Sequence, residues 1–102
     1  MPNPARVLKV FSEDTRLRIL RLISEHELCV SELMEALGIP QSSISRHLTA
    51  LRQAGLVKDR REGAWVYYSI TSGEEPFVAS LWDVIRLHLG AVSYTHLRAH
   101  ES

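Results

Sequence analysis

A chain of 102 residues with 45% apolar side chains has the composition of one small globular domain rather than of a disordered segment. Its single cysteine excludes an intramolecular disulfide, and no apolar run approaches the roughly 20 residues that a membrane-spanning helix needs. The formal net charge of zero argues at first against a polyanionic partner. Because MPNPARVLKV also lacks a secretory hydrophobic region, we expect a cytoplasmic protein with no membrane contact.

Two helices are predicted at the start of the chain. The first spans residues 4–11, where Pro4 suits the first turn, and its apolar side chains are those of Val7, Leu8 and Phe11. The second follows Ser12, its expected N-cap, and has a broad apolar face between residues 17 and 23. Its arginines are expected to face solvent: Arg16, Arg18 and Arg21.

Residues 31–57 have the pattern of a helix-turn-helix, two short amphipathic helices around a tight break. The first of these helices carries Leu33 and Leu37, and Ser31 is its expected N-cap. The break is the segment Gly38-Ile39-Pro40.

The second helix of this pair has two chemically different sides. Ile44, Leu48 and Leu51 share one face at 100° per residue. The opposite face carries short polar side chains and one guanidinium: Ser42, Arg46, Thr49 and Gln53. A face of this kind can enter a groove of duplex DNA.

Residues 56–60 and 65–70 are rich in β-branched and aromatic side chains, and the four residues between them predict a β-hairpin, or wing. Arg60 and Arg61 near its tip could reach a phosphate or a minor groove, and a solvated hairpin tip is the alternative. From Gln41 to Arg61 there are five cations and one acid, a net charge of +4 that the rest of the chain balances. This basic segment is the expected footprint of a nucleic-acid contact.

Residues 76–89 return to helical spacing, with more apolar surface than one face of a small domain requires. We therefore expect the first and last helices to form a two-fold dimer interface. Its expected residues are Val7, Leu8, Phe11, Phe77, Leu81, Trp82 and Ile85. Residues 91–102 continue none of these patterns and include SYTHLRAH, which resembles translated adapter sequence. We expect a non-native or disordered tail there, and one domain over residues 1–90.

Four motifs in this order resemble the ArsR/SmtB family of winged-helix transcriptional repressors over residues 4–89: EDTRLRILRLI at 13–23, ELCVSEL at 27–33, QSSISRHLTALRQAGLV at 41–57 and DRREGAWVYYSI at 59–70. The fold expected from the pattern and the resemblance is mainly α with a small β-hairpin, a winged helix-turn-helix that dimerises through its first and last helices. The resemblance implies a homodimer that binds an imperfect DNA palindrome and blocks transcription until an effector releases it. Two-fold symmetry requires half-sites roughly 34 to 36 Å apart.

The residues expected to contact DNA lie at the start of the recognition helix and on the wing. They are Gln41, Ser42, Ser43, Ser45, Arg46, His47, Arg60 and Arg61. Arg46 could read a guanine through two parallel hydrogen bonds. His47 lies only about 60° from the apolar stripe, so packing against a neighbouring helix is its alternative role.

Neither effector site that the resemblance implies is complete. Arsenic-responsive members carry thiols at the positions of Cys29, Ser31 and often Met34, and only Cys29 is kept, as a weak candidate ligand. The family's zinc pattern on the last helix would use Asp83 and a histidine two positions later, but Ile85 stands there. The remaining histidine candidates are His88, His96 and His100. No cofactor is evident, and a metal or metalloid effector has no complete ligand set.

Three kinds of sensor stay open: a metalloid sensor whose missing thiols lay in a lost C-terminus, a redox sensor that uses Cys29 alone or across two subunits, and a regulator that answers a ligand the sequence does not reveal, which we favour. A winged helix that contacts another protein instead of DNA is the competing function. An enzyme is not expected, because the sequence has no nucleophile elbow, no Gly-rich phosphate loop and no carboxylate pair at catalytic spacing.

Overall fold

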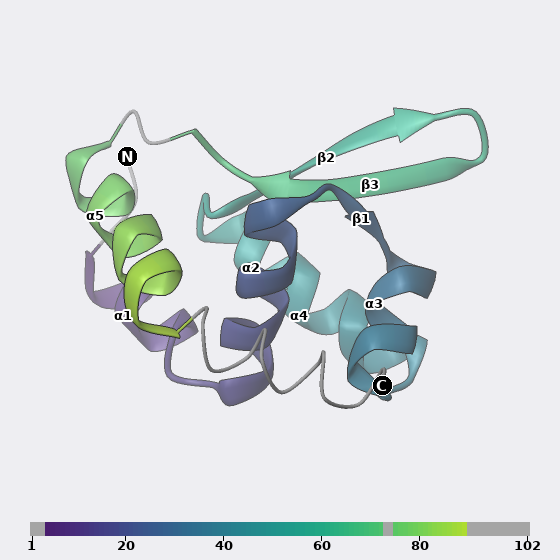
Figure 1. Cartoon of the computed structure of the whole chain (residues 1–102), viewed down its shortest axis with the longest axis horizontal. Helices are drawn as coiled ribbons and strands as arrows, with labels where there is room; N and C mark the ends of the chain where they lie inside the picture. Colours follow the sequence, from purple (N-terminus) through teal and green to yellow (C-terminus); the bar gives the residue numbers. More distant parts are fainter. Residues whose placement is uncertain (1–3, 73–74, 90–102) are drawn as a thin grey trace.

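The computed structural model describes residues 4–72 and 75–89, and the expected tail at 91–102 lies outside these residues. The predicted fold class, mainly α with a small β-hairpin in a winged helix-turn-helix, is confirmed: the helices lie on one side of a small antiparallel sheet that forms one edge of the molecule (Figure 1). The dimerisation that was part of the prediction stays a prediction. The elements are α1 (Pro4–Val10), α2 (Asp14–Glu25), β1 (Leu28–Cys29), α3 (Val30–Leu37), α4 (Gln41–Gln53), β2 (Val57–Glu62), β3 (Trp65–Ile70), α5 (Pro76–Val84) and a π-helical turn, η1 (Ile85–Leu89). Within the described part of the chain, no helix is long and apolar enough to cross a membrane.

The helix-turn-helix forms where the sequence predicts it. Helix α3 ends at Gly38, which adopts a left-handed φ of 68° and donates its N–H to the Met34 carbonyl oxygen at 2.8 Å. Helix α4 then begins directly after Pro40, which lacks an N–H and stands at the N-cap. The apolar stripe of α4 is almost wholly buried, at 0 to 2% exposure for Ile44, Leu48 and Leu51. Its polar side is therefore the one turned to solvent.

Two capping predictions are wrong. Helix α3 begins at Val30, so its N-cap is Cys29 and not Ser31, and the Cys29 N–H donates to Glu32 Oε1 at 2.9 Å. Glu32 reaches back because an acid three residues into a helix can satisfy the N-cap amide. Ser12 likewise does not cap α2: its hydroxyl donates to the Lys9 carbonyl oxygen at 2.6 Å and closes α1 instead.

The sheet has three strands in the order β1-β3-β2, and the sequence predicted only two of them. Strand β1 was missed because two residues are too few to show a period. It pairs antiparallel with β3, placing Leu28 opposite Tyr68 and Cys29 opposite Tyr67. The hairpin turn is Gly63-Ala64, and Gly63 has the positive φ of 62° that a two-residue turn with glycine first requires.

The core is built around α2, which lies centrally in the fold (Figure 1). Its side chains Ile19, Leu20 and Ile23 are buried together with residues from every other helix, among them Val7, Leu33 and Ile85. Two of the three solvent predictions for the arginines of α2 fail, since the Arg16 side chain is only 16% exposed and Arg21 is buried. Arg21 is only 8% exposed, and its Nη2 lies 2.7 Å from Glu25 Oε1, because the aliphatic stem of an arginine packs on apolar surface when an acid is near its head.

Helices α1 and α5 lie together at one side of the molecule (Figure 1), and the expected interface residues divide there into two groups. Val7, Trp82 and Ile85 are 0 to 3% exposed, so they belong to the protomer's own core and offer no surface, which corrects that part of the prediction. Leu8 is 53% exposed, whereas Phe11, Phe77 and Leu81 are partly buried. Val84 and Leu87 extend this apolar surface at 45% and 74% exposure.

Candidate DNA-binding interface

The outward face of α4 combines short polar side chains with one cation. Gln41, Ser42, Arg46, Thr49 and Gln53 are exposed, and Ser43 and Ser45 are partly so. Arg46 is not paired with an acid among the described residues. Because a guanidinium without a fixed partner can turn its two parallel donors toward a guanine, this face has the chemistry of base readout.

His47 lies beneath this face rather than on it. The side chain is 5% exposed, and Arg16 Nε donates to its Nδ1 at 3.1 Å, which makes Nδ1 an acceptor and the imidazole neutral. Arg16 is in turn paired with Glu13 at 2.8 Å. We therefore withdraw His47 from the expected DNA contacts, because this side chain lies next to the apolar stripe of α4 and packs between α2 and α4.

The burial of His47 predicts a pH-dependent stability. Desolvation lowers its pKa from 6.5, with Arg16 and Arg46 acting in the same direction and Glu13 opposing them. The unfolded chain therefore takes up the proton first, so stability present above about pH 6.5 is lost as the pH falls toward the lowered pKa.

Chemical denaturation between pH 7.5 and 5 should show a smaller loss of unfolding free energy for His47→Gln than for the native chain. His26→Gln, at an exposed position, is the matched control and should keep the native pH slope. A pH slope for His47→Gln equal to the native one would contradict this assignment.

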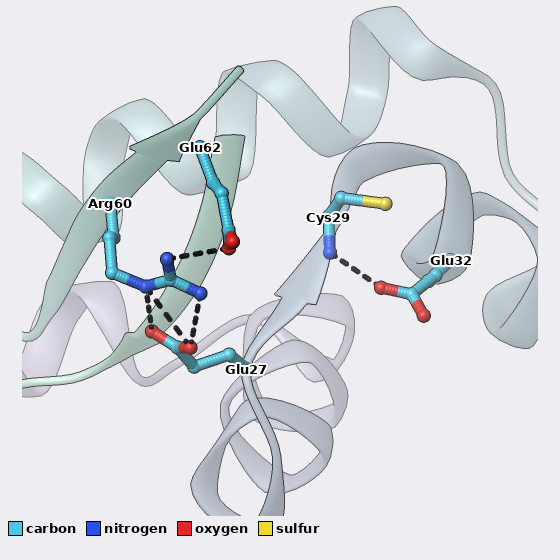
Figure 2. Close-up of polar contacts among 5 residues, drawn as sticks. All are labelled: Glu27, Cys29, Glu32, Arg60 and Glu62. Carbon is cyan, nitrogen blue, oxygen red and sulfur yellow. Dashed lines mark hydrogen bonds and ion pairs between the residues drawn. The ribbon is translucent and has the colours of Figure 1, made fainter. Parts of the chain in front are cut away.

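The wing presents its cations in two different states. Arg60 is held by acids: Nη2 lies 2.9 Å from Glu27 Oε1, and Nη1 lies 2.8 Å from Glu62 Oε2 (Figure 2). Arg61 and Lys58 are exposed and have no acid partner among the described residues. At the base of the wing, Arg52 Nη1 lies 3.2 Å from Asp59 Oδ2. The basic segment therefore contains fewer available cations than its composition suggests.

Glu27 is the residue of this region that sequence reasoning missed. No neighbouring residue in the sequence indicates a role for Glu27, because its partner Arg60 is 33 residues away. Only the pairing of β1 with β3 brings the two together, and β1 is the strand whose pattern was too short to recognise.

The candidate effector residues do not assemble into a site. Cys29 is 7% exposed, and its Sγ lies 3.6 Å from the Ser31 hydroxyl. Asp83 lies 3.2 Å from Arg86 in an exposed ion pair. Residues 4–72 and 75–89 contain no group of three histidine, cysteine or acidic side chains placed to hold a metal ion. His96 and His100 lie outside the described residues.

Comparison with protein families gives a match to "Bacterial regulatory protein, arsR family" over residues 13–59. The arsenic resistance transcriptional regulator ArsR1 of Pseudomonas putida is 53% identical over 69 residues, which are 67% of this chain and 54% of that protein. The arsenical resistance operon repressor of Escherichia coli is 42% identical over 81 residues, 78% of this chain and 69% of that protein. The chain thus spans about half the length of the first relative and two thirds of the second.

Solved structures show the same fold. Reduced HlyU from Vibrio cholerae superimposes with a TM-score of 0.72 at 36% identity, covering 83% of this chain and 87% of that one. The homodimeric winged helix-turn-helix DNA-binding domain of Mb0332 from Mycobacterium bovis gives a TM-score of 0.69 at 36% identity, with 81% and 74% coverage.

Proposed function

Because the chain belongs to the arsR family of bacterial regulatory proteins, we propose that it is a sequence-specific DNA-binding transcriptional regulator, a homodimeric repressor that an effector releases. The observation that carries this proposal is the two-sided α4. Its leucine and isoleucine stripe is locked in the core, while its serine and arginine side is free to enter a major groove. A regulator of this kind acts in the cytoplasm, where bacterial DNA is found.

The proposed DNA contacts follow from this exposure. Gln41, Ser42, Ser43 and Ser45 stand in the first turns of α4, from which a recognition helix reaches base edges and phosphates, and Arg46 is the base-reading residue. On the wing, Arg61 near the tip is the proposed contact, whereas Arg60 is paired with acids; Lys58 is a further exposed cation without an acid partner among the described residues. Residues 1–90 make up the proposed DNA-binding and dimerisation domain.

Dimerisation supplies the second recognition helix. The exposed apolar side chains of α1, α5 and η1 would be covered by the same surface of a second copy, as two-fold symmetry requires. The neighbour from Mycobacterium bovis is homodimeric, which supports this arrangement. The matching DNA is an imperfect palindrome with half-sites roughly 34 to 36 Å apart.

The effector we propose is not a metalloid held within one protomer. The names of two relatives refer to arsenic, but a thiophilic ion needs two or three thiolates, and this chain has one cysteine. The Ser31 hydroxyl beside Cys29 stays protonated at neutral pH and is a poor substitute. A different ligand, or oxidation of Cys29, is the effector class that agrees with these residues.

The test of the proposed function is the salt dependence of binding to the duplex upstream of the gene. With about four to six phosphate contacts per dimer, log K plotted against log salt should fall with a slope near −4 to −5. A scrambled duplex of equal length should show a comparable slope but weaker binding. A shallow slope, or no binding to any duplex, would instead favour a winged helix that contacts another protein.

A further inference from the structure

All three nitrogens of the Arg60 guanidinium donate hydrogen bonds to carboxylates. Its Nε and Nη2 donate to the carboxylate of Glu27 at 2.9 to 3.3 Å, and its Nη1 donates to Glu62 Oε2 at 2.8 Å (Figure 2). The guanidinium carbon lies 5.2 Å from the centre of the Tyr67 ring. We call these four residues, Glu27, Arg60, Glu62 and Tyr67, the wing clasp.

The charges of the wing clasp make it a poor contact for DNA. Two carboxylates surround one guanidinium, so the group carries a net negative charge, and a phosphate approaching it would be repelled by both acids. The hydrogen bonds from Arg60 also lower the pKa of Glu27, which keeps that carboxylate ionised. Arg61, the next residue, has no such partners among the described residues and is exposed.

The wing clasp lies where the hairpin leaves the rest of the sheet. Strand β1 covers β3 only at Tyr67 and Tyr68, so the pairs Arg61–Val66 and Glu62–Trp65 extend past it without a third strand. Arg60 and Cys29 both pair with Tyr67, which puts the three residues in one row across the sheet. Glu27 stands between α2 and β1, so its bond to Arg60 joins the protruding hairpin to the body of the domain.

We propose that Arg60 is a positioning residue, which Glu27 holds at the root of the wing so that the neighbouring Arg61 contacts DNA. This inference rests on the proposed DNA-binding function. A single exposed ion pair contributes little to stability. The Arg60 guanidinium, however, is fixed in one orientation by three contacts together: a forked bond to one carboxylate, a bond to a second acid and the face of an aromatic ring. The wing direction is thereby set before DNA binds, which reduces the ordering cost of the contact.

The first experiment uses the protein without DNA. Hydrogen exchange of the wing amides at residues 61–66 should accelerate in Arg60→Gln and Glu27→Gln, and the double variant should be no faster than either single one. Glu62→Gln is the matched control. Like Glu27→Gln, it removes one carboxylate charge beside Arg60, but it leaves intact the ion pair that joins the hairpin to the body of the domain. Unchanged exchange in Glu27→Gln, or equal acceleration in Glu62→Gln, would overturn the positioning role.

The second experiment separates Arg60 from Arg61 by salt dependence on the upstream duplex. Arg61→Gln should reduce the magnitude of the log-log slope by about 2 per dimer, one contact for each protomer. Arg60→Gln should weaken binding several-fold while the slope stays native, since no phosphate contact is lost. A slope reduced equally by Arg60→Gln would make Arg60 a DNA contact and overturn the proposal. Failure of the native protein to bind DNA would overturn the proposed function. The hydrogen-exchange experiment would still test whether the bond between Glu27 and Arg60 holds the wing.

Discussion

Arg46→Gln is expected to lower the affinity for the operator by at least about 30-fold and to abolish most of the preference over a scrambled duplex. A bidentate arginine–guanine contact contributes about 1 to 3 kcal/mol of discrimination, roughly 5- to 150-fold for each half-site. Because a palindrome uses the residue twice, the two free-energy losses add, and the total loss is about the square of the single-site factor, about 30-fold at the lower end of this range. Fluorescence anisotropy on both duplexes at one salt concentration measures the two effects.

The fold should survive this change, since Arg46 is exposed and has no ion-pair partner among the described residues. Gln53→Ala is the matched control: it removes a polar side chain from the same face of α4, three turns away from the N-terminal end. Its effect on affinity should be small. An equal loss on operator and scrambled duplex after Arg46→Gln would mean that Arg46 binds a phosphate rather than a base.

The sequence predicted those parts of the fold in which residues close together in the chain determine the local structure. The left-handed position after α3 favours glycine, and Gly38 occupies it. The stripe of α4 repeats within three turns and is buried as predicted. The wing needs only two β-rich runs and a glycine turn, so its strands were placed within two residues of their observed ends.

Apart from the two local capping errors at Ser12 and Ser31, the differences concern contacts between residues far apart in the chain. His47 and Arg16 are 31 residues apart, and Arg60 and Glu27 are 33 apart. No local pattern reports which acid a surface arginine will meet, so Arg60 looked as available as Arg61. The burial of Arg21 is difficult to predict for a related reason, because it depends on which other elements pack against α2 and not on the pattern of α2 alone.

Leu8→Glu combined with Leu87→Glu should convert the proposed dimer to a monomer and raise its dissociation constant more than a thousandfold. Both side chains are more than half exposed in the protomer, at 53% and 74%, so their only large burial would be against a second copy. Fully burying a leucine contributes about 1.5 to 3 kcal/mol, and symmetry counts each position twice. A carboxylate at the same place also has to be desolvated without a partner. Analytical ultracentrifugation at micromolar concentration measures the change.

Operator binding should fall together with dimerisation, because a monomer engages one half-site and loses the second recognition helix. Leu8→Met with Leu87→Met is the matched control, since it keeps apolar surface of similar volume at both positions and should stay dimeric. Circular dichroism should show an unchanged helix content for the glutamate variant, as neither leucine contributes to the buried core. A glutamate variant that remains dimeric would place the interface elsewhere. A monomeric variant that binds the operator at native affinity would show instead that one recognition helix and one wing supply the whole contact.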